Sequence, residues 1–165
     1  MFNFLKKTEV SHLDGSDLVS LESKLGIKFE DKKLLVQALT HSSAVNETGL
    51  EDSMSNERLE FLGDALIGIV IAQLLFKSEE EFSEGDLTNL RSQIVRGSTL
   101  QRAAINLSLD KFLILGRGER KSGGANRPSN LEDGFEALVG AQLARKRIIT
   151  TTLEIIVVFL FILFS

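Results

Sequence analysis

Three carboxylates lie at helical spacing where an apolar segment begins, within residues 56–76. Glu57, Glu60 and Asp64 stand at positions i, i+3 and i+7, which places them within roughly 60° on one face of a helix. Such a stripe is most often a solvated surface. From residue 61 onward, however, the segment is apolar on all sides, so we expect the acids to lie at the edge of a buried face.

A second acidic pair repeats part of this spacing. Asp133 and Glu136 stand at i and i+3 in LEDGFEALVGA, among small and apolar neighbours. Buried carboxylates must be paired, protonated or bound to a cation, and the first acidic helix offers only Arg58 as a basic partner. Two such helices facing each other would form an oxygen-only site for Mg²⁺, with Mn²⁺ as the alternative. Such a metal supports hydrolysis of a phosphodiester backbone.

The elements that must position these acids are predicted to be nearly all helical. Apolar residues recur at spacings of three and four, and the only proline is Pro128. The pattern predicts a single all-α helical bundle. We expect helices over 18–25, 34–39 and 56–76, helices on either side of Gly97 with an N-cap at Ser83, and a last helix from about Asn130.

Composition limits the class of protein. The 165 residues contain no cysteine and only two histidines, which excludes disulfides, thiol nucleophiles and cysteine-ligated zinc. The N-terminal residues lack the pattern of a secretory signal, and we expect a cytoplasmic protein. The net charge of −4 counts against tight binding of a polyanion by this chain alone.

Four blocks of sequence stand out along the chain: ALTHSS at 38–43, NERLEFLGDA at 56–65, SEGDLTNLRSQIV at 83–95 and LGRGERKSGGANRPSNLEDGFEALVGA at 115–141. In their order and spacing they resemble the ribonuclease III family. A single short motif arises by chance, but four blocks in the family's order do not. The resemblance covers roughly residues 18–141 and identifies this part as a ribonuclease III catalytic domain, a helical bundle.

The resemblance implies a homodimeric, Mg²⁺-dependent endonuclease. It would cut both strands of double-stranded RNA, leaving 5′-phosphate and 3′-hydroxyl ends, in the processing of rRNA, mRNA and other structured RNA. By motif position the metal ligands would be Glu60, Asp64, Asp133 and Glu136. Asp64 and Glu136 would be catalytic together with Glu57, which would help to position the cut, and Glu136 would be the least replaceable ligand.

Other polar groups were weighed against structural roles. His41 is expected to be structural, because no serine-hydrolase elbow accompanies it. Residues 116–128 are predicted to form an exposed loop without the pattern of a P-loop. RNA backbone contact and plain solvation are equally expected for its cations, Arg117, Arg120, Lys121 and Arg127. Glu84 is a candidate RNA-site residue, although helix capping is the favoured interpretation.

The two ends depart from this pattern. Residues 1–15 are expected to be a flexible arm, 16–141 the catalytic domain and 142–165 a divergent apolar tail, with the double-stranded-RNA-binding domain of the family absent. The tail ends in ten apolar residues at 155–164, too short for a clean membrane span, so we expect no membrane partner. The alternatives are a truncated, inactive relative that binds RNA or dimerises, and a membrane-attached interaction protein.

Overall fold

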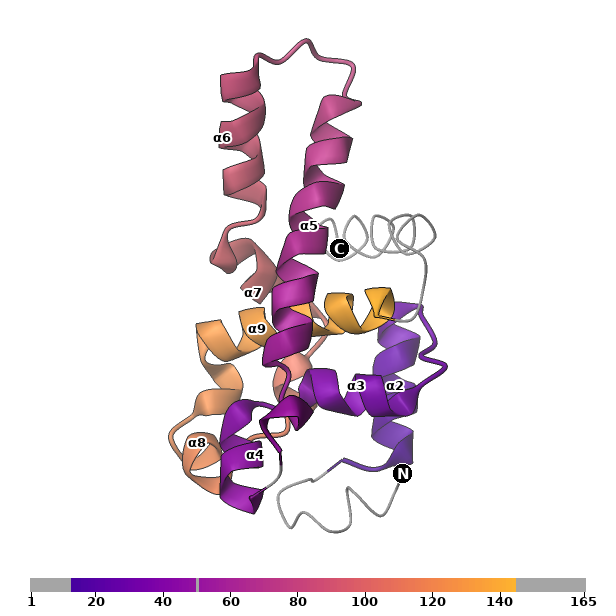
Figure 1. Cartoon of the computed structure of the whole chain (residues 1–165), viewed down its shortest axis with the longest axis vertical. Helices are drawn as coiled ribbons and strands as arrows, with labels where there is room; N and C mark the ends of the chain where they lie inside the picture. Colours follow the sequence, from indigo (N-terminus) through magenta and orange to yellow (C-terminus); the bar gives the residue numbers. More distant parts are fainter. Residues whose placement is uncertain (1–12, 50, 145–165) are drawn as a thin grey trace.

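The computed structural model describes residues 13–49 and 51–144, which fold into helices around two central ones (Figure 1). No strand occurs within these ranges; one isolated bridge pairs Thr40 with Ile114. The predicted all-α class is therefore confirmed. The helices are α2 Gly15–Leu25, α3 Lys32–Leu39, α4 Ser42–Thr48, α5 Glu57–Phe76, α6 Glu84–Ile94, α7 Gly97–Asn106, α8 Arg117–Lys121 and α9 Pro128–Leu143, with short 3₁₀ turns η1 Asp52–Met54, η2 Leu109–Lys111 and η3 Gly124–Asn126.

Local sequence signals explain where several helices begin. Asp14 caps α2 and Ser83 caps α6, each in a capping box with an aspartate three residues later. Pro128 opens α9 at a position where its missing N–H costs nothing. The predicted N-cap at Ser83 is confirmed, and the predicted break near Gly97 lies between α6 and α7.

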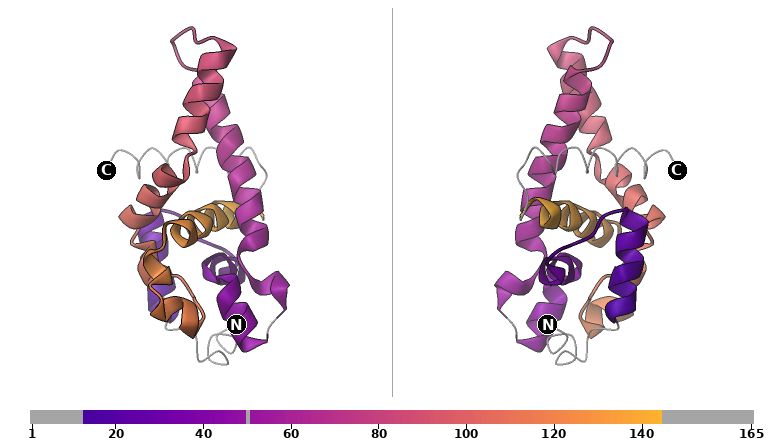
Figure 2. Two further views of the ribbon diagram at one scale, coloured as in Figure 1. Left: turned by 90° about the vertical axis from the view of Figure 1, so that its left-hand side faces the viewer. Right: turned by 90° about the vertical axis from the view of Figure 1, so that its right-hand side faces the viewer.

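Helices α5 and α9 cross at direct backbone contact. A Cβ atom on Gly63 would overlap the carbonyl of Glu136, and one on Gly140 would overlap the carbonyl of Leu59. Only glycine at both positions permits this approach. Figure 2 shows α9 lying across α5, and the two glycines mark the crossing point.

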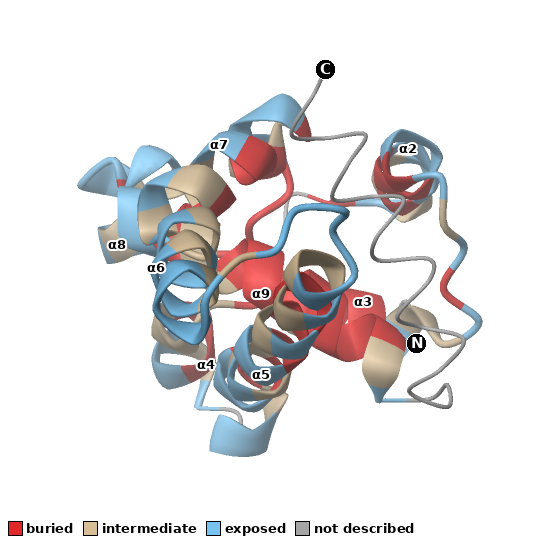
Figure 3. Ribbon diagram, turned by 90° about the horizontal axis from the view of Figure 1, so that it is seen from above, coloured by how far each residue is buried: buried red, intermediate tan, exposed pale blue. Residues whose placement is uncertain are grey.

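The core surrounds α9. Its buried residues run almost without interruption from Gly134 to Gln142. Helices α3 and α7 pack against it, and the burial colouring places α3 and α9 at the centre of the molecule (Figure 3). The largest fully buried side chains include Phe135, Leu35, Leu39, Ile67 and Leu100.

The second half of α5 and the whole of α6 form a hairpin that projects from this body (Figure 1). No residue of α6 is buried. Three large apolar side chains of α5 face solvent, with Phe61 79%, Ile69 59% and Phe76 80% exposed. Helix α5 is also long and apolar enough to cross a membrane by length and composition, although a third of that window is buried inside the protein.

Helices also form in two polar segments where none was predicted. Before α5, the chain forms α4 and η1. The loop expected at 116–128 contains α8 and η3, and its Gly116 and Gly124 are buried. Tertiary contacts hold both segments: Ser43 Oγ accepts a hydrogen bond from the Gly116 N–H at 3.0 Å, and Glu47 accepts one from the Arg117 N–H at 2.5 Å.

The expected domain limits shift at both ends. Within the predicted N-terminal arm, Leu13 is buried in the core and Asp14 caps α2, so residues 13–15 belong to the fold. Helix α9 continues to Leu143, and Gln142, expected to begin the divergent tail, is buried. Residues 1–12 of the arm and 145–165 of the tail lie outside the described residues.

Candidate carboxylate site

The crossing of α5 and α9 brings the two predicted acidic pairs together. Glu60 and Asp64 lie on either side of Gly63, whose backbone touches α9 at Glu136. Glu136 is only 8% exposed, Glu60 and Asp133 are half-buried, and Asp64 and Glu57 are exposed. In the structure, the carboxylates of these two helices therefore lie at the edge of a buried face, where the spacing had predicted them.

The carboxylates interact strongly. Burial, followed in order of size by the negative charges of Asp64, Glu132, Glu60 and Asp133, raises the pKa of Glu136 to about 8. Burial also raises the pKa of Glu60 to about 7, with Asp133 as the largest charge contribution. Both groups therefore lie close enough to the other acids to be destabilised when ionised.

Asp133 differs from these two acids because a nearby positive charge opposes part of the rise in its pKa. Burial raises the pKa of Asp133, whereas the positive charge that His41 can carry lowers it. His41 comes from the segment before α4, 92 positions earlier in the chain (133 − 41). The structure therefore brings His41 close to the acidic cluster, although the sequence predicted a structural residue there.

Another acid, Glu132, also belongs to the cluster and was not predicted. Its pKa is raised by burial and then by Asp133 and Asp64. Its carboxylate covers the backbone of Gly97, the first residue of α7, where a Cβ would overlap it. Its i, i+4 spacing from Glu136 places the two acids on one helix face and is the sequence signal that could have indicated it.

Apart from His41 beside Asp133, these acids have no basic partner within residues 13–49 and 51–144. Among the described residues, no lysine or arginine forms a salt bridge with Glu57, Glu60, Asp64, Glu132, Asp133 or Glu136. Nor do any three described His, Asp or Glu side chains, as they stand, converge on one point as a set that could hold a metal ion. The donors are gathered on one patch without forming a closed coordination shell.

Glu57 borders a separate hollow at the start of α5. This hollow is lined by Ser42, Val45, Asn46, Asp52, Ser55 and Glu57. The buried Ser55 donates a hydrogen bond through its hydroxyl to Glu57 Oε2 at 3.4 Å. The lining of this hollow is mostly polar and contains no lysine or arginine.

The structure does not bring Glu84 to the cluster. Glu84 is an exposed residue in the first turn of α6, at the end of the hairpin far from α9 (Figure 1). Its Oε1 accepts a hydrogen bond from Thr88 at 3.0 Å. Within this chain, Glu84 therefore has the position of an acid that interacts favourably with the positive end of the helix dipole.

Most of the predicted RNA-binding cations make contacts within the protein. Arg127 forms a salt bridge with Glu119, and Arg117 forms one with Glu47. Arg120 donates to the carbonyl of Leu113 at 2.7 Å. Lys121, at the exposed end of α8, projects its charge from the surface.

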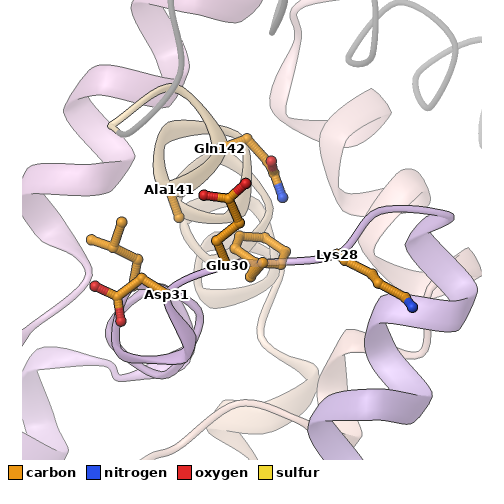
Figure 4. A pocket seen from close by; sticks show the side chains of 7 residues that line it. Lys28, Glu30, Asp31, Ala141 and Gln142 are labelled. Atoms are coloured by element: carbon orange, nitrogen blue, oxygen red, sulfur yellow. The ribbon is translucent and has the colours of Figure 1, made fainter.

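A small pocket at the other end of α9 is separate from these acids. Figure 4 shows it between the last turn of α9 and the segment that leads into α3. Its lining residues are Lys28, Phe29, Glu30, Asp31, Leu34, Ala141 and Gln142. Gln142 Nε2 is buried there and has no hydrogen-bond partner within the part of the chain that the structure describes.

The fold and the site together define a helical domain with an uncompensated carboxylate cluster where two helices cross. A family model described as Ribonuclease-III-like matches residues 31–152. Ribonuclease 3 of Dehalococcoides mccartyi is 50% identical over 125 residues, which are 76% of this chain and 53% of that protein. Ribonuclease 3 of Shouchella clausii is 45% identical over 136 residues, 82% of this chain and 52% of that protein.

A solved structure agrees with these relatives. The nuclease domain of ribonuclease III from Campylobacter jejuni superposes with a TM-score of 0.77 at 35% identity, covering 85% of this chain and 94% of that one. That structure is described as flexible in the region involved in dimer formation. The chain belongs to the ribonuclease-III-like family. It spans about half the length of the curated relatives it matches.

Proposed function

We propose that this chain is the catalytic domain of a divalent-cation-dependent endoribonuclease that cleaves double-stranded RNA. The observation that carries the proposal is the carboxylate cluster at the crossing of α5 and α9, where Glu136 and Glu60 have raised pKa values and no lysine or arginine partner among the described residues. The 45–50% identity with proteins named Ribonuclease 3 supports it.

The donor set suits a hard cation. All the donors at the crossing are carboxylate oxygens, the ligands that Mg²⁺ and Mn²⁺ accept. Glu60, Asp64, Asp133 and Glu136 would hold the cation. Without a cation, repulsion between the negative charges keeps the carboxylates apart. The flexible side chains of the two glutamates would allow the carboxylates to converge on a positive charge. When bound, such a cation supplies Lewis acidity and a bound water of lowered pKa.

The protein's own residues supply rigidity and orientation. Because Gly63 and Gly140 hold the two helices at backbone contact, the acids of both helices are fixed relative to each other. Glu136 is nearly enclosed by protein, so its charge is poorly screened by water and acts strongly on a neighbouring cation. Glu57, exposed beside the hollow at the start of α5, would position the RNA strand.

RNA contact by this part of the chain is expected to be weak and sensitive to salt. Affinity for a duplex depends on neutralising phosphates, and three of the four predicted cations already make contacts within the protein. Lys121 is the cation that we expect to contact the backbone. Arg117, Arg120 and Arg127 would add their charges from the same edge, whereas Glu84 would reach RNA only from the hairpin.

We further propose a homodimer formed through the exposed apolar strip of α5. Phe61, Ala65, Ile69 and Phe76 recur within about 80° of one helix face at 100° per residue, directly beside the acidic stripe. Contiguous exposed apolar surface of this kind marks an interaction site. Burial against a second copy also accounts for the apolar character of α5 without a membrane, in keeping with a cytoplasmic location.

The test is incubation of the purified chain with long double-stranded RNA, single-stranded RNA and double-stranded DNA, each with Mg²⁺ and with chelator. The proposal predicts discrete, Mg²⁺-dependent products from double-stranded RNA alone, with 5′-phosphate and 3′-hydroxyl ends. Processing of rRNA or mRNA would then be tested on structured transcripts. RNA binding or stable dimers without any cleavage would instead favour the inactive relative.

A further inference from the structure

The hollow at the start of α5 is a second polar surface, close to the carboxylate cluster but distinct from it. Its volume is about 240 Å³, several times the roughly 30 Å³ that one water molecule occupies in the liquid. Its walls come from α4, from η1 and from the first residues of α5. Because Glu57 precedes Glu60 by three residues, the hollow begins one helical turn from the carboxylate cluster.

The side chains that line the hollow have unused hydrogen-bonding capacity. Within residues 13–49 and 51–144, the side chains of Ser42, Asn46 and Asp52 make no hydrogen bond or salt bridge. A serine hydroxyl and an asparagine amide both donate and accept hydrogen bonds, whereas an aspartate carboxylate accepts them. The hollow therefore offers donors and acceptors together to a polar group that enters it.

Glu57 is held so that one of its two oxygens remains available. Its Oε2 accepts a hydrogen bond from the hydroxyl of Ser55 at 3.4 Å, and Ser55 is only 2% exposed. The other oxygen, Oε1, has no hydrogen-bond partner among the described residues. The buried serine thus restrains the carboxylate of Glu57, which keeps a free acceptor at the edge of the hollow.

The charge of the lining disfavours a phosphate group as the ligand. The hollow contains no lysine or arginine, and its two charged residues, Asp52 and Glu57, are both acidic. Phosphates are bound chiefly by cations and by N–H donors. Both carboxylates are exposed and can be hydrated by solvent, so the hollow does not require a bound cation either. A neutral group that donates hydrogen bonds fits this lining best.

The minor groove of double-stranded RNA displays such groups. In A-form RNA this groove is wide and shallow and exposes the 2′-hydroxyls, which both donate and accept hydrogen bonds and which DNA lacks. We propose that the hollow binds ribose 2′-hydroxyls next to the cleaved bond, with Glu57 Oε1 as an acceptor and with Ser42 and Asn46 as further partners. This inference rests on the proposed function, and it assigns the residues by which the domain distinguishes RNA from DNA.

The experiment combines changes in the protein with changes in the RNA. A duplex with one mapped cleavage site is prepared with ribose throughout, or with 2′-deoxyribose at the nucleotides that flank the cut. The full chain is tested as wild type, as the double variant Ser42→Ala/Asn46→Ala and as Ser53→Ala. Ser53 is the matched control, because it is an exposed serine two residues from Ser55 that does not line the hollow. Binding is measured by fluorescence anisotropy in chelator at low salt, and cleavage is measured in Mg²⁺.

We expect 2′-deoxyribose to weaken binding by wild type and by Ser53→Ala roughly threefold to tenfold for each hydroxyl contacted. The double variant should bind the ribose duplex more weakly by a similar factor and should not respond to 2′-deoxyribose. An equal response of wild type and the double variant would overturn the inference. If thermal unfolding shows that the double variant is unfolded, Asn46→Ala, at an exposed position, makes the same comparison for one contact.

The base edges of the minor groove provide a further comparison. Inosine in place of guanosine removes the amino group that guanine presents in this groove. A loss of wild-type binding with inosine, and none with 2′-deoxyribose, would assign the hollow to a base edge and overturn the inference.

Failure of the proposed function gives a different result from failure of this inference. If the wild-type chain binds double-stranded RNA but cuts none in Mg²⁺, the proposed function falls, while binding in chelator still tests the hollow. If the wild-type chain cuts double-stranded RNA and binds the ribose and 2′-deoxyribose duplexes equally, only the role of the hollow falls. A wild-type chain that binds no duplex at low salt would overturn both.

Discussion

Glu136 is held among acids, nearly out of contact with water, and this arrangement favours its neutral form in the absence of a cation. Burial is the larger cause of its raised pKa, and the neighbouring acids add to it. The same holds for Glu60. A group whose pKa is higher in the folded chain than in the unfolded chain stabilises the fold while it is protonated, and this stabilisation is lost as the pH rises.

The first prediction concerns stability against pH. In chelator, the free energy of unfolding should be largest below about pH 4.5. It should fall as the pH rises through about 7 and about 8, which are the pKa values of Glu60 and Glu136 in the folded chain. Mg²⁺ should restore stability at the upper end. Urea unfolding between pH 5 and pH 9 measures this. Glu136→Gln should flatten the profile, and a wild-type profile that rises with pH would contradict the interpretation.

The second prediction separates RNA contact from structure at the edge of α8. Lys121→Gln should weaken binding to double-stranded RNA and lower the slope of affinity against salt by about 1, without loss of stability. Arg127→Gln should also lower the free energy of unfolding, because Glu119 loses its cation. Fluorescence anisotropy over a salt series, with urea unfolding of both variants, makes the comparison. Equal salt slopes for Lys121→Gln and wild type would remove Lys121 from the RNA surface.

Among the individual residues of the site, the acids were easier to predict from the sequence than the histidine beside them. Glu60, Asp64, Asp133 and Glu136 follow helical spacing, so one helix face could be inferred for each pair. Glu132 is at i, i+4 from Glu136 and could have been assigned in the same way, but His41 could not. His41 is held in place through the pairing of residues 40–41 with Ile114. This relation is tertiary, and no periodicity in the sequence indicates it.

The element that matters most is the glycine contact between α5 and α9. Each glycine faces a backbone carbonyl of the other helix, and nothing flexible stands between them. The acids lie beside this contact, so the separation of the helices sets the separation of the carboxylates. The spacing of the carboxylates therefore depends on the two glycines, Gly63 and Gly140, at the contact.

The third prediction follows from that contact. Gly63→Ala should lower the free energy of unfolding by about 3 kcal/mol or more, because the added methyl group forces two helix backbones apart. Gly118→Ala in α8 is the matched control, since its Cβ would meet open space, and it should be neutral or stabilising by up to about 1 kcal/mol. Urea unfolding tests both. Equal stabilities for the two variants would show that the helices do not meet at Gly63.

Elements were predictable where their own sequence specifies them. Helix α5 has a long apolar run, and α6 has a capping box, so both followed from the sequence. Helices α4 and α8 are short and polar, and neither was predicted as a helix. They are held by contacts with each other, from Ser43 to Gly116 and from Glu47 to Arg117, which a pattern along the chain does not reveal.

At the scale of the whole molecule, the projecting hairpin leaves an apolar strip beside the acids. The strip is formed by Phe61, Ala65, Ile69 and Phe76 on α5. A second copy packed on it would bring two carboxylate sites into one assembly, which suits cleavage of both strands of a duplex. The chain alone, with net charge −4, is poorly equipped to attract RNA from a distance.

The fourth prediction tests this strip. Phe61→Glu should convert a dimer to a monomer, because a charge would be buried at the interface without a partner. Ile105→Glu provides the control: Ile105 is similarly apolar and 54% exposed, but lies on α7. Light scattering coupled to size exclusion gives the masses. A dimer that survives Phe61→Glu, or a wild-type monomer at high concentration, would contradict the proposed interface.

The role of the carboxylate cluster is tested by the rate of Mg²⁺-dependent cleavage of a long double-stranded RNA by wild type and Glu136→Gln. Glutamine keeps the shape of the side chain and removes its charge. We expect cleavage by wild type and a loss of more than about a hundredfold in Glu136→Gln, about 2.7 kcal/mol in activation free energy. Glu79→Gln, an exposed control beyond α5, should cleave normally. Full cleavage by Glu136→Gln would contradict the assignment of the carboxylate cluster as the catalytic site.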